Sequence, residues 1–142
     1  MDVCALSRPF DDQGFMRIRL ETEAVNLILS KAREGHFKLL VSAVHDVEIR
    51  AIDDSVERIK LQTILSEMGE RIKSDPPGIR NRAEELVQLG FGVADAAHLS
   101  FAEFYGAEFI SCDDRLIKKS MSHKIAAWCG SPLAFCEKEG LR

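Results

Sequence analysis

Apolar residues recur with helical spacing over most of the chain, and short apolar runs of strand length interrupt them. The helical spacing predicts helices over 15–34, 44–52, 54–69, 81–90, 93–105 and 113–122. The short runs predict strands over 37–43, 107–112 and 124–128. Strands that alternate with helices are typical of a parallel sheet with helices on both faces. We therefore expect a single α/β domain over residues 1–142.

The apolar positions of two helices predict which of their faces pack on the sheet. The expected buried positions are Met16, Leu20, Leu27 and Ile28 in the first helix, and Val56, Ile59, Ile64 and Met68 in the third. A breaker over 74–78 follows, because it contains two prolines and a glycine. A proline turn is expected at Ser131–Pro132.

The predicted helix 93–105 consists mostly of small and apolar residues, yet an aspartate lies in its first turn. In helical spacing Asp95 shares one row with Leu99, Ala102 and Gly106. Because the rest of this row is apolar or small, the carboxylate is expected to point toward the protein. Such a charge is costly unless a partner compensates it.

Other segments offer carboxylates near the same edge of the predicted sheet. Glu48 and Asp113 each follow a predicted strand, and Asp2 at the start of the sequence is a further candidate. Converging carboxylates repel one another, and a hard divalent cation such as Mg²⁺ or Mn²⁺ relieves the repulsion. Two such ions about 4 Å apart can activate water and stabilise the leaving oxygen in phosphodiester cleavage. Asp95 would then have a metal ion as its partner.

Simpler interpretations of these acids remain open. The chain has 23 acidic residues, and many of them are expected on the surface. Asp113 and Asp114 could simply cap the next helix. The spacings His45-x-x-Glu48 and Asp95-x-x-His98 also occur in di-iron centres, but those need four long facing helices, which the breakers and strands exclude. We interpret His98 as a packed or hydrogen-bonded core histidine.

Composition and charge narrow the classes of function. The 142 residues are 46% hydrophobic and 30% charged, which suits one soluble domain with a core. A net charge of -4 argues against a simple basic coat for nucleic acid. No apolar run reaches the roughly 20 residues of a membrane helix, and Asp2 and Arg8 interrupt any signal peptide. We expect a cytoplasmic protein whose four scattered cysteines are reduced.

Two common catalytic patterns are missing from the sequence. It contains no phosphate-binding loop of the form G-x-x-x-x-G-K-[ST]. Neither Ser42 nor Ser111 has histidine and acid partners at a spacing that supports a serine hydrolase.

Three segments together resemble the PIN domain family, and most closely its VapC-type toxins. They are MDVCALSRPFDDQ at the start, LLVSAVHDVEI in the middle and GVADAAHLSFAEFYGAEFISCDDRL near the end. The resemblance implies a Rossmann-like three-layer α/β/α sandwich with a mostly parallel sheet. It also implies RNA cleavage that depends on Mg²⁺ or Mn²⁺. The catalytic and metal-binding acids would be Asp2, Glu48, Asp95 and Asp113.

The resemblance extends to partners and to a substrate contact. Arg115 would hold RNA phosphates beside the metal site. The toxin half of a toxin–antitoxin pair would bind a cognate antitoxin and form a homodimer. Two other functions remain as alternatives. One is a non-catalytic PIN domain that binds RNA or a protein through the same surface, and the other is a receiver-like signalling domain, which the position of Asp11 and Asp12 fits poorly.

The sequence departs from the family pattern in two places near its start. The family often has Ser, Thr or Asn near its first and last acids, and here Cys4 and Ser111 stand at these positions. The cysteine would weaken an outer hydrogen bond. Only Met1 precedes Asp2, whereas the family has a strand of several residues ahead of its first acid. Either the true start lies upstream, or most of the central first strand is lacking, and in the second case Asp2 would be held poorly and activity would be weak or absent.

Overall fold

The computed structural model describes residues 1–73 and 76–142, so positions 74 and 75 of the predicted breaker lie outside the described residues. The chain is a mixed α/β protein in which 64% of the described residues are helical. The strands are short, with two or three residues each. No helix in the described ranges is both long and apolar enough to cross a bilayer.

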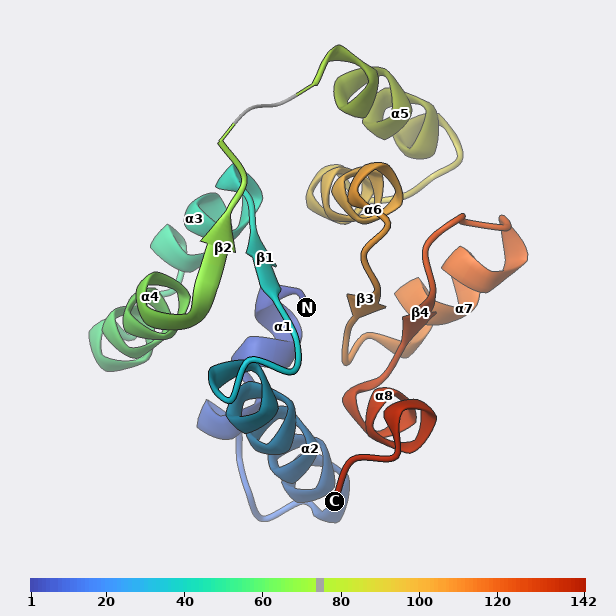
Figure 1. The fold of residues 1–142 in the computed structure, drawn as a ribbon. Coiled ribbons are helices and arrows are strands. Elements are labelled where there is room, and N and C mark those ends of the chain that lie inside the picture. Colours follow the sequence, from blue (N-terminus) through green and yellow to red (C-terminus); the bar gives the residue numbers. More distant parts are fainter. Residues whose placement is uncertain (74–75) are drawn as a thin grey trace.

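The helices follow the chain in the order shown in Figure 1. They are α1 (Val3–Leu6), α2 (Met16–Arg33), α3 (Ala43–Arg50), α4 (Ser55–Met68), α5 (Pro77–Gln88), α6 (Val93–Tyr105), α7 (Asp114–Ser122) and α8 (Pro132–Glu139), with a 3₁₀ turn η1 (Arg8–Phe10) after α1. Helix α6 has the bounds that the sequence predicts. Helices α2, α3 and α4 differ from their predicted bounds by one or two residues at each end, and α7 begins one residue later than predicted and ends as predicted.

The strands form two separate pairs. Strand β1 (Leu39–Val41) lies parallel to β2 (Gly69–Arg71), and β3 (Phe109–Ile110) lies parallel to β4 (Cys129–Gly130). Figure 1 shows β1 and β2 on one side of the molecule, β3 and β4 on the other, and the N-terminus between them. The expected parallel pairing is present, but two small sheets replace the expected single central sheet. The extended backbone at Met1–Asp2 lies between them, and the N–H of Asp2 donates to the carbonyl of Ile110.

The hydrophobic core is divided in the same way as the sheets. One cluster lies around β1 and includes Val41, Ile49 and Leu61. A second cluster lies around α6 and β3 and includes Leu99 and Phe109. A third, smaller cluster joins Ile28, Ile110 and Phe135, and the partly buried Met1 packs against both it and the first cluster. The start of the chain therefore connects the two halves of the core.

Several sequence predictions about the elements are wrong. The last strand lies at Cys129–Gly130 and not over 124–128. Pro132 begins helix α8 because Ser131 caps that helix, so the expected turn is a helix start. Four residues expected in the core are instead exposed: Met16, Leu20, Val56 and Ile59. The buried faces of α2 and α4 are formed by Glu21, Thr22, Ala24, Val25 and Ile28, and by Leu61 and Leu65.

Candidate functional site

Asp2 lies at the meeting point of the two halves of the molecule. Its side chain is 4% exposed, and its Oδ1 accepts the N–H of Ala5 at 2.8 Å, which caps α1. Its own N–H donates to the carbonyl of Ile110 at 3.0 Å. Burial raises the pKa of the Asp2 carboxyl, and hydrogen bonds from Ser111 and Ala5 oppose the shift. Asp2 is thus firmly held, contrary to the expectation from the short start of the sequence.

Glu48 is positioned by a histidine on another helix. It lies on α3, and its Oε1 accepts a hydrogen bond from Nε2 of His98 on α6 at 2.5 Å. The His98 side chain is 4% exposed and that of Glu48 is 31% exposed, so the pair lies at the edge of the core. His98 is the hydrogen-bonded core histidine that the sequence indicates, and its partner is one of the predicted acids.

Asp95 is half-buried in the first turn of α6 and has no hydrogen bond or ion pair among the residues that the structure describes. Burial raises the pKa of its carboxyl, and the negative charge of Asp2 raises it further. Asp113 and Glu48 act in the same direction, while His98 opposes them. The three other predicted acids therefore all lie close enough to Asp95 to disfavour its ionised form.

Asp113 caps helix α7 and begins the basic segment. Its Oδ1 accepts the N–H groups of Arg115 and Leu116 at 2.8 and 3.1 Å, and its own N–H donates to the Ser111 hydroxyl at 3.0 Å. The capping interpretation of Asp113 is confirmed. Asp114 instead forms an ion pair with Arg17 at 2.7 Å. The side chain of Arg115 is exposed and has no ion pair within the described ranges.

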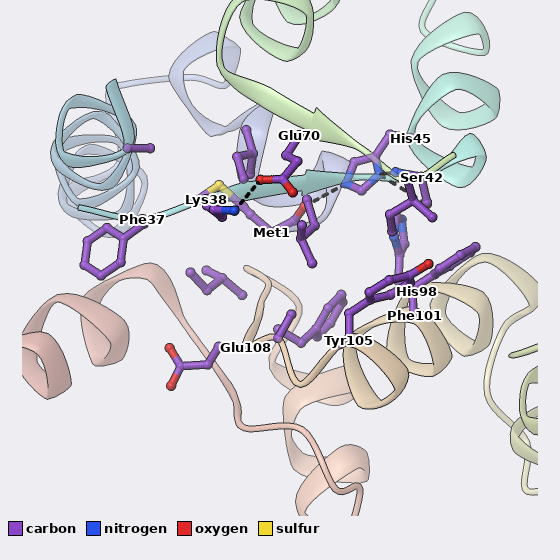
Figure 2. A pocket seen from close by; sticks show the side chains of 18 of the residues that line it. Met1, Phe37, Lys38, Ser42, His45, Glu70, His98, Phe101, Tyr105 and Glu108 are labelled. Carbon is purple, nitrogen blue, oxygen red and sulfur yellow. Dashed lines mark hydrogen bonds and ion pairs between the residues drawn. The ribbon is translucent and has the colours of Figure 1, made fainter. Parts of the chain in front are cut away.

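Sequence reasoning missed the part that His45 has in holding this site together. His45 accepts the N–H of Ser42 at Nδ1, 3.1 Å away, and its Nε2 donates to the carbonyl of Met1 at 2.9 Å. Figure 2 shows this histidine between Ser42 and Met1, with His98 nearby. The rings of His45 and His98 lie edge to face, with centroids 4.7 Å apart. Ser111, the small polar residue expected near Asp113, bonds both Asp2 and the N–H of Asp113. The Ser-x-x-His pattern of a capping box was the available signal for His45.

Replacing His45 by glutamine is expected to flatten the dependence of stability on pH. Burial, and then the charge of His98, lowers the pKa of His45 from 6.5 to about 4. The unfolded chain therefore binds a proton that the folded chain does not, and stability falls as the pH drops from 6.5 to 4. Between these two pH values, the free energy of unfolding is expected to change by roughly 3 kcal/mol because of His45. Urea unfolding of H45Q and the natural chain at several pH values measures it, and equal slopes between pH 4 and 6.5 would contradict this account.

The other three acids affect the pKa of Asp95, but the four side chains are not grouped as the ligands of a metal ion. Within residues 1–73 and 76–142, no three histidine, cysteine or acidic side chains are grouped so that they could hold a metal ion. The donor types nevertheless suit a hard cation, because they are carboxylate oxygens and the half-buried Asp95 has no partner. A cation would have to draw these side chains together by rotation about their own bonds.

Comparison with known proteins adds no relative from which a function can be transferred. No family model, no curated protein and no solved structure matches the chain.

Proposed function

We propose that the chain is a PIN-class ribonuclease that depends on Mg²⁺ or Mn²⁺. The observation that carries the proposal is Asp95, a half-buried carboxylate without a hydrogen-bond or ion-pair partner among the described residues. Burial raises its pKa, and the charges of three other acids from distant segments raise it further. Carboxylates that repel one another in a folded protein are stabilised by a positive charge close to them. On this proposal the two sheets and their helices are the halves of the three-layer PIN sandwich that the sequence resembles.

The residues of the chain have separable roles in this proposal. Asp2, Glu48, Asp95 and Asp113 would hold the cation, which when bound lowers the pKa of water and neutralises charge that develops on the phosphodiester. Glu48 and Asp113 each use one carboxylate oxygen for a hydrogen bond inside the protein. His98 orients Glu48, as the partners of metal ligands commonly do. Ser111 and Ala5 orient Asp2.

The proposal is tested by cleavage of a fluorescently labelled single-stranded RNA. We expect cleavage by the purified chain in Mn²⁺ or Mg²⁺ and none in excess chelator. Glu48→Gln should reduce the rate at least about a hundredfold, because it removes one of the charges that hold the cation. Cleavage that continues in chelator would contradict the proposed chemistry. Failure to bind Mn²⁺ at millimolar concentration would favour the non-catalytic alternative.

Arg115→Ala is expected to weaken the binding of RNA and to leave the chemical step unchanged. Its exposed guanidinium lies in the first turn of α7, two residues after Asp113. We expect KM to rise about three- to tenfold at constant kcat, and the slope of log KM against log salt to fall by about one. Arg33→Ala is the matched control, because Arg33 is also exposed and unpaired within the described ranges. An equal change in both variants would remove Arg115 from the substrate contact.

The biological role that fits this activity is the toxin of a toxin–antitoxin pair. This part of the proposal rests on the resemblance, which also implies a homodimer and an antitoxin that covers the acids. Induced expression in a bacterium should arrest growth, and the Glu48→Gln chain should not. Growth that is unaffected by an active, soluble enzyme would contradict the toxin role and leave the ribonuclease proposal standing.

A further inference from the structure

Helix α2 contains a buried carboxylate that is not one of the four predicted acids. Glu21 is 2% exposed, and its two oxygens lie against two guanidinium groups. Its Oε2 is 2.6 Å from Nε of Arg8, and its Oε1 accepts the Nε–H of Arg17 at 2.8 Å. Charges are costly to bury, and apolar residues in place of a buried ionic network often give equal or greater stability. Stability alone therefore does not account for a glutamate at this position.

Arg17 connects α2 to the start of α7. Its two terminal nitrogens donate to the two carboxylate oxygens of Asp114 at 2.7 and 2.8 Å. The side chains are 55% and 53% exposed, so the pair adds little to stability, but its two parallel bonds fix the relative position of the two groups. Asp114 is the first residue of α7 and follows Asp113 directly. Arg17 therefore holds the chain one residue after a predicted ligand of the cation.

Arg8 holds the chain one residue before the same ligand. Burial raises the pKa of the Cys112 thiol to about 12, and a hydrogen bond from Arg8 opposes this shift. Arg8 also forms an ion pair with Asp11 at 2.8 Å. Cys112 is 5% exposed and directly precedes Asp113. The two neighbours of Asp113 in sequence are thus bound by two arginines, and both arginines lie against Glu21.

The carboxylate of Asp113 has one oxygen left for a ligand. Its Oδ1 accepts the N–H groups of Arg115 and Leu116, and its Oδ2 has no hydrogen bond with any residue that the structure describes. Because Oδ1 is tied to the backbone of α7, the direction of Oδ2 is set by the position of residues 112–114. Groups that orient a metal ligand from behind commonly affect the affinity for the metal.

We propose that Glu21, Arg8 and Arg17 position Asp113 for the divalent cation, and that Arg17 does so through its bond to Asp114. We call these three residues the clamp. This inference rests on the proposed function, because it takes Asp113 as a ligand of the cation. The residues of the clamp contact neither the cation nor the RNA, so they are positioning residues and not catalytic ones.

Arg17→Met separates positioning from simple electrostatics, because the two predict changes of opposite sign. Removal of a positive charge beside the acids would by itself strengthen the binding of Mn²⁺. Loss of the clamp should instead weaken it about three- to tenfold, as measured by calorimetric titration of Mn²⁺ into the full chain. Saturating Mn²⁺ should restore kcat, and KM for RNA should stay constant. Equal or tighter binding of Mn²⁺ by the variant would overturn the inference.

Arg82→Met is the matched control for this substitution. Arg82 donates to both carboxylate oxygens of Glu103 at 2.8 and 3.2 Å and so joins α5 to α6. The control therefore also removes one positive charge and one two-bond ion pair between helices. Its affinity for Mn²⁺ should stay within about twofold of the natural chain, even where its Tm falls. A loss of affinity equal to that of Arg17→Met would show general loosening and would overturn the inference.

A double variant tests the route through Asp114. If Arg17 acts only by holding Asp114, the chain with both Arg17→Met and Asp114→Asn should bind Mn²⁺ no more weakly than the chain with Asp114→Asn alone. Losses of affinity that add in the double variant would contradict this route.

Glu21→Gln tests the buried end of the clamp without any metal. The substitution removes the charge that both arginines share, so residues 112–114 should be held less firmly. Amide hydrogen exchange at Arg115 and Leu116, which Asp113 caps, should become at least about threefold faster while the far-UV spectrum stays native. Unchanged exchange at both amides in this variant would contradict the role of Glu21.

The same measurements distinguish failure of the clamp from failure of the proposed function. A natural chain that binds no Mn²⁺ would overturn both. A natural chain that binds Mn²⁺ and cleaves RNA, beside an Arg17→Met variant of unchanged affinity, would overturn the clamp alone. A raised KM for RNA at unchanged affinity for Mn²⁺ would make Arg17 a contact of the substrate and would contradict the positioning role.

Discussion

Asp95→Asn is expected to abolish Mn²⁺-dependent cleavage of RNA and to leave the fold intact. The substitution removes one of the carboxylates proposed to hold the cation, so the rate should fall at least about a hundredfold. The fold should survive because Asp95 makes no hydrogen bond or ion pair with a described residue. Because its pKa is raised, the ionised carboxylate is less favourable in the folded chain than in the unfolded chain, so its charge does not stabilise the fold. Without metal, the Tm of the variant should therefore not fall.

Thermal unfolding measures the binding of Mn²⁺ separately from the cleavage of RNA. Mn²⁺ should raise the Tm of the natural chain as its concentration increases, and this rise should be lost in the Asp95→Asn variant. Asp53→Asn is the matched control, because Asp53 is exposed and has no partner within the described ranges. Equal cleavage by the natural chain and the Asp95→Asn variant would eliminate the mechanism. An equal loss in the Asp53→Asn control would show that net charge, and not position, governs activity.

Gly69→Ala is expected to destabilise the protein by about 2–4 kcal/mol. Helix α4 ends at Met68 and β2 begins at the next residue, so the chain turns sharply there. A Cβ at Gly69 would lie 2.4 Å from the carbonyl oxygen of Leu65 and 2.4 Å from Cγ2 of Val41. Both neighbours are buried, and the first belongs to the backbone, so neither can move cheaply. The free energy of unfolding in urea measures the effect.

Gly78→Ala is the control for this substitution. Gly78 lies in the first turn of α5, and a Cβ there meets no atom within 4 Å. Its stability should be unchanged or slightly raised, because alanine favours the helix more than glycine does. A Gly69→Ala chain as stable as the Gly78→Ala chain would show that β1 and β2 do not require their close approach.

The helices could be predicted from the sequence because their signals are local. The spacing of small and apolar residues gives α6 its bounds, and Gly106 ends it in the left-handed conformation with a φ of 60°. Strand β2 could not be predicted in this way. Its three residues, Gly69–Arg71, are mostly polar, and the strand exists because its backbone pairs with β1. The exposed apolar residues of α2 and α4, such as Met16 and Val56, show the same limit: burial depends on what packs against a helix.

For the candidate site too, features within one helix could be predicted from the sequence, and contacts between distant segments could not. The row that contains Asp95 indicates a carboxylate that faces the protein, and the structure places it half-buried. The contact between His98 and Glu48 joins positions fifty residues apart in sequence, so no spacing pattern within one helix could reveal it. The same is true of the bond from His45 to Met1.

The most direct measurement is the anomalous difference map of a crystal soaked in Mn²⁺. The central claim is that carboxylates from four separate segments share a divalent cation. It predicts at least one peak within ligand distance of Asp95 and of two or more of Asp2, Glu48 and Asp113, about 2.0–2.4 Å from their oxygens. A map without a peak at Asp95 under saturating Mn²⁺, or with peaks only at acids elsewhere on the surface, would contradict the claim.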